Sequence, residues 1–130
     1  MAKLRHVALM ATNIHTTAQW FIEAFELEEV GRWEVGEGGV IYLSDGTVNV
    51  AIVSQGPEDH PNHLPFGLNH IGFMVDDRVA EMERLERLGA TVTLPPPPEG
   101  VDVGYFEVKL ETPDGIPFDI SHHPWPGVRI

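Results

Sequence analysis

The sequence contains no cysteine among its 130 residues. This absence excludes disulfide bridges, catalytic thiolates and zinc sites built on cysteine, and it favours a reducing cytoplasm. Long hydrophobic runs are also missing, since no stretch approaches the roughly 18 to 20 apolar residues that a membrane helix needs. The apolar stretch near the N-terminus is short and is interrupted by His6, so we expect no signal peptide. We therefore expect a cytoplasmic protein that does not bind membranes.

Basic residues are scarce. Lysine and arginine number 8 against 20 aspartate and glutamate residues, which gives a net charge of −12. Nucleic-acid binding requires a basic surface, so we expect no nucleic-acid partner. An acidic surface attracts cations weakly to any cleft. The length suits one compact domain, and the hydrophobic content of 42% is sufficient for a core.

An internal repeat organises the chain. Residues 4–10 read LRHVALM and residues 68–74 read LNHIGFM, so both follow the pattern Leu-x-His, apolar, small, apolar, Met. The offset of 64 positions, obtained from 70 minus 6, divides the chain into two halves of similar size. We expect a single domain of two modules, organised as module one at about 1–54, a linker at 55–67, module two at about 68–121 and a tail at 122–130.

Each half predicts one helix after its first strand. Asn13 is a suitable N-cap for a helix at Ile14–Phe25, and Asp76 or Asp77 can cap a second helix at 78–88. An Asp-Gly turn precedes the last strand of each half. Alternating and apolar runs predict three strands after each helix, at 31–35, 39–43, 47–53, 91–94, 105–111 and 116–121.

The strand faces suggest a polar site. Side chains alternate across a strand, so His6 shares a face with Ala8, and His70 shares a face with Gly72. In the last strand Asp119 lies on the face opposite Phe118 and its apolar neighbours. A buried aspartate is costly unless it meets a cation or strong hydrogen bonds. We therefore expect His6, His70 and Asp119 to converge on one divalent ion.

Two imidazoles and one carboxylate suit several metals. Fe2+, Mn2+, Zn2+, Ni2+ and Co2+ all accept this ligand set, and with open positions it forms the facial triad of non-haem iron enzymes. A zinc ion with three protein ligands and a water is equally compatible.

Module one offers a less certain counterpart of Asp119. Matching the strand faces selects Asn49, whereas counting four residues from Gly46 selects Val50. The two ways of aligning the modules disagree, and the alternation expected between buried and cavity-facing residues favours Asn49.

The residues quoted so far resemble the vicinal oxygen chelate superfamily, which comprises glyoxalase I, bleomycin-resistance proteins, extradiol dioxygenases and their relatives. The resemblance covers nearly the whole chain. Its carriers are Leu4-x-His6, the run from Leu68 to Phe73, and TPDGIPFD at 112–119.

This resemblance implies an α+β fold in which two tandem βαβββ modules form a cupped mixed sheet around a metal site. It implies His6, His70 and Asp119 as the metal ligands and catalytic residues, with Asn49 or Val50 where a fourth ligand, often glutamate, would stand. It also implies a homodimer. Asp119 replaces the usual glutamate, and the missing carboxylate near position 49 argues against a glyoxalase I mechanism.

The leading functional hypothesis is a metal-dependent enzyme that acts on a small molecule with vicinal oxygens, by dioxygenase or by lyase or transferase chemistry. Isomerase chemistry ranks lower because no pair of bases is evident. The alternative is a metal-free protein that binds or sequesters a small molecule, as bleomycin-resistance proteins do. A regulatory domain is a third hypothesis. Candidate substrate contacts are Asn49, Tyr42, Tyr105 and His122.

Overall fold

The protein divides into two compact units in the computed structural model. The first unit combines Arg5–Asn69 with Trp125–Ile130, and the second combines Met1–Leu4 with His70–Pro124. Each unit therefore contains one copy of the repeat and a short segment from the opposite end of the chain. The structure describes residues 1–36, 38–59, 64–96 and 107–129.

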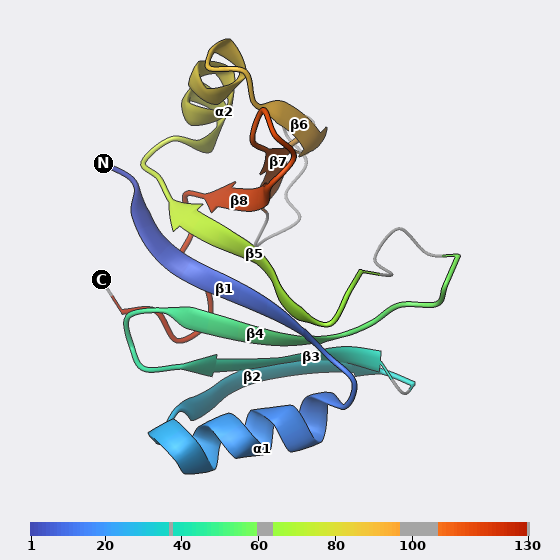
Figure 1. The fold of residues 1–130 in the computed structure, drawn as a ribbon. Helices are drawn as coiled ribbons and strands as arrows, with labels where there is room; N and C mark the ends of the chain where they lie inside the picture. Colours follow the sequence, from blue (N-terminus) through green and yellow to red (C-terminus); the bar gives the residue numbers. More distant parts are fainter. Residues whose placement is uncertain (37, 60–63, 97–106, 130) are drawn as a thin grey trace. The chain divides into compact units, whose positions relative to one another are not determined.

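The first unit has the element order β-α-β-β-β (Figure 1). Its strands are hydrogen-bonded in the order β2-β3-β4-β1, with β1 and β4 parallel and the other neighbours antiparallel. Helix α1 packs on β3 and β4. The elements are β1 (Lys3–Ala11), α1 (Ile14–Phe25), β2 (Glu28–Val35), β3 (Gly38–Ser44) and β4 (Asn49–Ser54).

The core of the first unit lies between α1 and one face of its strands. Ile14 and Ala18 of the helix are buried against Ile41 and Ile52 of the sheet. The expected core face of β4 is confirmed, because Ile52 is buried and Val50 packs on the same cluster. The opposite face of β4 therefore carries Asn49, which is also buried.

The second unit repeats this order. Its strands are hydrogen-bonded in the order β5-β8-β7-β6, with β5 and β8 parallel and the other neighbours antiparallel. Helix α2 contacts β6 and β8. The elements are β5 (Gly67–Met74), α2 (Arg78–Arg87), β6 (Thr91–Leu94), β7 (Val108–Glu111) and β8 (Pro117–Ser121).

The second core is smaller. Val108, Leu110 and Ile120 are buried, and Phe118 packs against them. Ile116 lies outside this core, because it precedes β8 and its side chain is 55% exposed. The turn from Thr112 ends only at this residue, whose backbone N–H donates to the Thr112 hydroxyl, so strand alternation has not yet begun there.

The two helix caps follow the sequence closely. The side chain of Asn13 accepts hydrogen bonds from the backbone N–H groups of His15 and Thr16. The side chain of Asp77 does the same for Val79 and Ala80. These bonds satisfy backbone donors that an uncapped helix leaves without an intrahelical acceptor.

We expect Asn13→Ala and Asp77→Ala each to lower the free energy of unfolding by about 1 kcal/mol, because each removes a cap. Urea denaturation followed by circular dichroism measures this change. Asp76→Ala is the control, since Asp76 carries the same charge and its carboxylate pairs with the exposed Met1 ammonium group. Equal losses for Asp76→Ala and Asp77→Ala would contradict the capping role.

The expected fold class is confirmed as α+β with two βαβββ modules of mixed strand direction. Of the predicted strand at 105–111, residues Val108–Glu111 form β7, while Tyr105 lies outside the described residues. Neither α1 nor α2, the helices of the described chain, has the length and apolar character needed to cross a membrane.

Candidate metal centre

His6 lies on β1 in the first unit and is buried, with 3% of its surface exposed. Its direct partner across the parallel pair β1–β4 is Asn49. The Nδ1 atom of His6 is 2.8 Å from Oδ1 of Asn49. The indole of Trp125 stacks on the imidazole, with ring centroids 4.8 Å apart and planes inclined by 2°. The His6 ring is therefore held both at its edge and on its face.

His70 and Asp119 meet in the second unit. They lie on the parallel neighbours β5 and β8, where Asp119 pairs with Gly72, two residues beyond His70 on the same face. The Nε2 atom of His70 is 2.9 Å from Oδ2 of Asp119. Two of the three predicted ligands are thus in contact, and the third, His6, belongs to the other unit, where it contacts Asn49.

Lys109 and Glu107 complete the surroundings of Asp119. Lys109 is the direct partner of Asp119 on β7, and its Nζ atom is 3.2 Å from each carboxylate oxygen. The same Nζ atom is 3.2 Å from Oε2 of Glu107. The second unit therefore gathers an imidazole, an ammonium group and two carboxyl groups.

The charges in this cluster perturb one another. Burial raises the pKa of Asp119, and although the hydrogen bond from His70 opposes this effect, the nearby Glu107 carboxyl reinforces it. Burial alone would lower the pKa of Lys109, but the negative charges of Asp119 and Glu107 outweigh it and raise that pKa. A buried carboxylate of this kind gains stability from any cation that reaches it.

The His70–Asp119 pair offers one nitrogen and one oxygen atom to a cation. The separation of 2.9 Å between Nε2 and Oδ2 is that of a hydrogen bond, and a bound ion would take the place of the shared proton. One imidazole nitrogen and one carboxylate oxygen are also suitable donors for first-row divalent metals. The residues present therefore fit a divalent ion.

Strand pairing revises the counterpart of Asp119 in module one. Asp119 pairs with Gly72, whose repeat equivalent is Ala8, and Ala8 pairs with Ala51. The equivalent position is therefore Ala51, two residues beyond Asn49 on the same face. Alternation alone could not separate the two positions, because residues two apart share a face. Alanine offers no side-chain ligand there.

Tyr42 and His122, two other residues predicted to contact the substrate, lie in different units. Tyr42 on β3 pairs with Ala51, on the face opposite the buried Ile41 and Leu43. The His122 ring packs on that of His123, with centroids 4.4 Å apart. The pKa of His122 is lowered, first by its partial burial and second by the nearby charge of Arg78.

The sequence reasoning missed Lys109 and Glu107. A signal was present, because Lys109 stands between Val108 and Leu110, both buried core residues of β7. A lysine flanked in this way must point to the opposite face, which is the face of Asp119. Alternation in the strand at 105–111 would therefore have placed Lys109 on the same face of the sheet as the aspartate.

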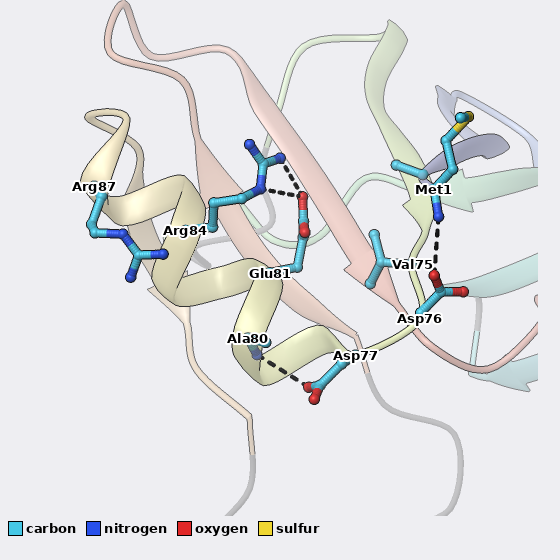
Figure 2. Close-up of a pocket in the computed structure, with 9 residues that line it drawn as sticks. Met1, Val75, Asp76, Asp77, Ala80, Glu81, Arg84 and Arg87 are labelled. Atoms are coloured by element: carbon cyan, nitrogen blue, oxygen red, sulfur yellow. Dashed lines mark hydrogen bonds and ion pairs between the residues drawn. The ribbon is translucent and has the colours of Figure 1, made fainter.

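One pocket in the second unit, of about 380 Å³, is not lined by the candidate ligands. Figure 2 shows it between the Met1 end of the chain and the start of α2. Its charges are largely matched, because the Met1 ammonium is 3.0 Å from Asp76 and Arg84 pairs with Glu81. The titratable cluster around Asp119, rather than this pocket, is therefore the candidate functional site.

Comparisons with solved structures agree with the fold described above. A hypothetical protein from Bacillus halodurans C-125 has a TM-score of 0.73 at 16% identity, covering 92% of each chain. A methylmalonyl-CoA epimerase from Streptomyces coelicolor, in complex with 2-nitronate-propionyl-CoA, has a TM-score of 0.74 at 18% identity, covering 91% of this chain and 94% of its own. The epimerase from Mycobacterium tuberculosis has a TM-score of 0.74 at 16% identity, covering 95% and 88%. At these low sequence identities, the TM-scores show that the folds are shared.

No curated protein matches the chain in sequence. A family model does match it over residues 3–120, which include all three predicted metal ligands. The chain therefore belongs to the Glyoxalase/Bleomycin resistance protein/Dioxygenase superfamily.

Proposed function

We propose that this protein is a divalent-metal-dependent enzyme in which His6, His70 and Asp119 hold the ion. The observation that carries the proposal is the contact of 2.9 Å between Nε2 of His70 and Oδ2 of Asp119, made by a carboxylate that is 2% exposed. His6 is included because it occupies the repeat position equivalent to His70. The proposed substrate is a small molecule with two neighbouring oxygen atoms.

The bound ion would act as a Lewis acid that stabilises negative charge developing on a substrate oxygen. Fe2+, Mn2+, Zn2+, Ni2+ and Co2+ remain the candidates. Lys109 would donate a hydrogen bond to the same developing charge, and Glu107 would accept or return a proton. Tyr42, Asn49 and His122 were predicted as substrate contacts, and of these Tyr42 keeps that role in the proposal.

Glu107 and Lys109 bear on the reaction class. They form an acid–base pair beside Asp119, which lyase or transferase chemistry can use. Such a pair also restores isomerase chemistry to consideration, while dioxygenase chemistry stays open with Fe2+. Because the two epimerase structures described above are those of methylmalonyl-CoA epimerases, acyl-CoA thioesters are the first substrates to assay.

Metal titration of the purified protein tests the proposal. After treatment with a chelator, we expect each chain to bind about one equivalent of Mn2+, Co2+ or Zn2+, measured by isothermal titration calorimetry and elemental analysis. The three proposed ligands would form one site, so a stoichiometry near one per chain is the expected result. Uptake of less than about a tenth of an equivalent of every candidate metal would refute a metal-dependent enzyme.

Metal-free binding of a small molecule is the second candidate, and Lys109 favours it. Its ammonium group already lies 3.2 Å from both oxygens of Asp119 and supplies a positive charge there. In that case Lys109 would recognise an anionic group of the ligand. We also propose a cytoplasmic homodimer, which native mass spectrometry and cell fractionation would test.

A further inference from the structure

Asn49 is fully buried, and both ends of its amide group have partners in the first unit. Its Oδ1 atom is 2.8 Å from Nδ1 of His6, and its Nδ2 atom donates a hydrogen bond of 2.9 Å to the carbonyl oxygen of Pro126. Asn49 therefore links the imidazole on β1 to the C-terminal segment.

These contacts determine where the proton on His6 lies. The Pro126 carbonyl can only accept a hydrogen bond, so the NH2 group of Asn49 must face it. The carbonyl oxygen of Asn49 then faces His6, and it too can only accept. The Nδ1 atom of His6 must therefore carry a hydrogen. In the neutral ring the lone pair is then on Nε2.

The C-terminal segment fixes Pro126 in place. Trp125 is 1% exposed and stacks on the His6 ring. Gly127 has a φ of 82°, and a Cβ atom added there would lie 2.6 Å from Cβ of Ser44, so only glycine fits. The backbone N–H of Arg129 donates to the carbonyl oxygen of Gly46 at 2.8 Å. The acceptor that orients Asn49 is therefore itself held rigidly.

We propose that Asn49 is a positioning residue for His6, which keeps the proton on Nδ1 and presents Nε2 as the nitrogen that binds metal. The proposal deepens the proposed function and rests on it for the metal. It replaces the two roles expected of Asn49, substrate contact and fourth ligand, by an indirect one. Residues that orient a metal-binding histidine typically contribute 10- to 100-fold to metal affinity.

Nuclear magnetic resonance of the metal-free protein labelled with 15N-histidine tests the proton position directly. Long-range proton–nitrogen correlations distinguish the two neutral tautomers of each ring. We expect His6 to be protonated at Nδ1 in the wild type. We expect Asn49→Leu, which keeps the branched shape of the side chain but removes the acceptor, to give a mixture of tautomers. His15 is the internal control, because it is exposed on α1, where its Nε2 atom is 2.7 Å from Oε1 of Glu34, and its signals should not change.

Asn49→Asp keeps an oxygen opposite His6, so we expect it to retain the Nδ1-protonated form. Titration with Co2+ or Zn2+ is the second readout, and Asn49→Leu should lower the affinity by about 10- to 100-fold. A wild-type His6 protonated at Nε2 alone would overturn the proposal, as would an Asn49→Leu protein with unchanged tautomer and affinity. If the wild type binds no metal but is protonated at Nδ1, and Asn49→Leu gives the mixture of tautomers, the positioning role holds and the metal-dependent function fails.

Discussion

Replacing His70 by alanine is expected to lower the affinity for divalent metal by at least about a hundredfold, since even changes to residues that only support a metal ligand cost 10- to 100-fold. His70 would supply one of three protein ligands, and its loss leaves the buried carboxylate of Asp119 without the imidazole 2.9 Å away. His6→Ala and Asp119→Asn should have effects of similar size. Calorimetric titration measures each affinity, and turnover should fall in parallel once a substrate is known.

His123→Ala is the matched control for these variants. His123 is exposed, and its backbone N–H rather than its side chain bonds to Ser121. This substitution should leave the metal affinity unchanged, while circular dichroism confirms that all four variants fold. Full metal occupancy in both His6→Ala and His70→Ala would show that the ion binds elsewhere, and the proposed site would have to be abandoned.

Lys109→Met is expected to raise the metal affinity by about tenfold, equivalent to about 1.4 kcal/mol. In the metal-free protein the Lys109 ammonium lies 3.2 Å from both oxygens of Asp119, so an incoming cation must compete with it for the carboxylate. Methionine has a similar length and replaces the apolar stem of the lysine side chain, but it carries no charge. Titration is done on the alkaline side of neutrality, at a pH of about 8, because burial raises the pKa of Asp119 and only its ionised form binds metal.

Lys3→Met is the control for this experiment. Lys3 is the only other lysine of the chain and it is exposed, so its replacement changes the net charge equally without touching Asp119. We expect no more than a small change in affinity from Lys3→Met. If Lys109→Met instead leaves the protein without metal binding and abolishes the binding of an anionic small molecule, the metal-free function is the better description.

Local chemistry made most of the fold predictable from sequence. The repeat of the Leu-x-His pattern at an offset of 64 positions gave the duplication, and Asn13 and Asp77 are the caps that the structure contains. Helix Ile14–Phe25 has the predicted bounds because its stripe of apolar residues ends where Glu26 adopts a left-handed conformation, with a φ of 59°. Signals of this kind act over a few residues and can be read without knowing the tertiary structure.

The details of the site depend on contacts between distant segments, which the sequence pattern does not specify. Alternation placed Asn49 and Asp119 on the correct faces, but only the pairing of Ala8 with Ala51 shows the register. The bond between Asn49 and Pro126 joins residues 77 positions apart, and no local pattern predicts it. Lys109 was detectable in principle, because its neighbours on β7 are apolar, but its contact with Asp119 depends on the pairing of two strands.

The distribution of the first unit over both ends of the chain has a consequence for biosynthesis. A ribosome that has completed β4 has not yet made Trp125 or Pro126, which cover His6 and orient Asn49. Domains usually fold in order as they emerge, the N-terminal part first. Here the first module must wait until Trp125 and Pro126 have been translated. The surroundings of His6 therefore form late. In a nascent chain arrested before residue 125, His6 would lack its stacking partner Trp125 and Asn49 would lack its acceptor on Pro126.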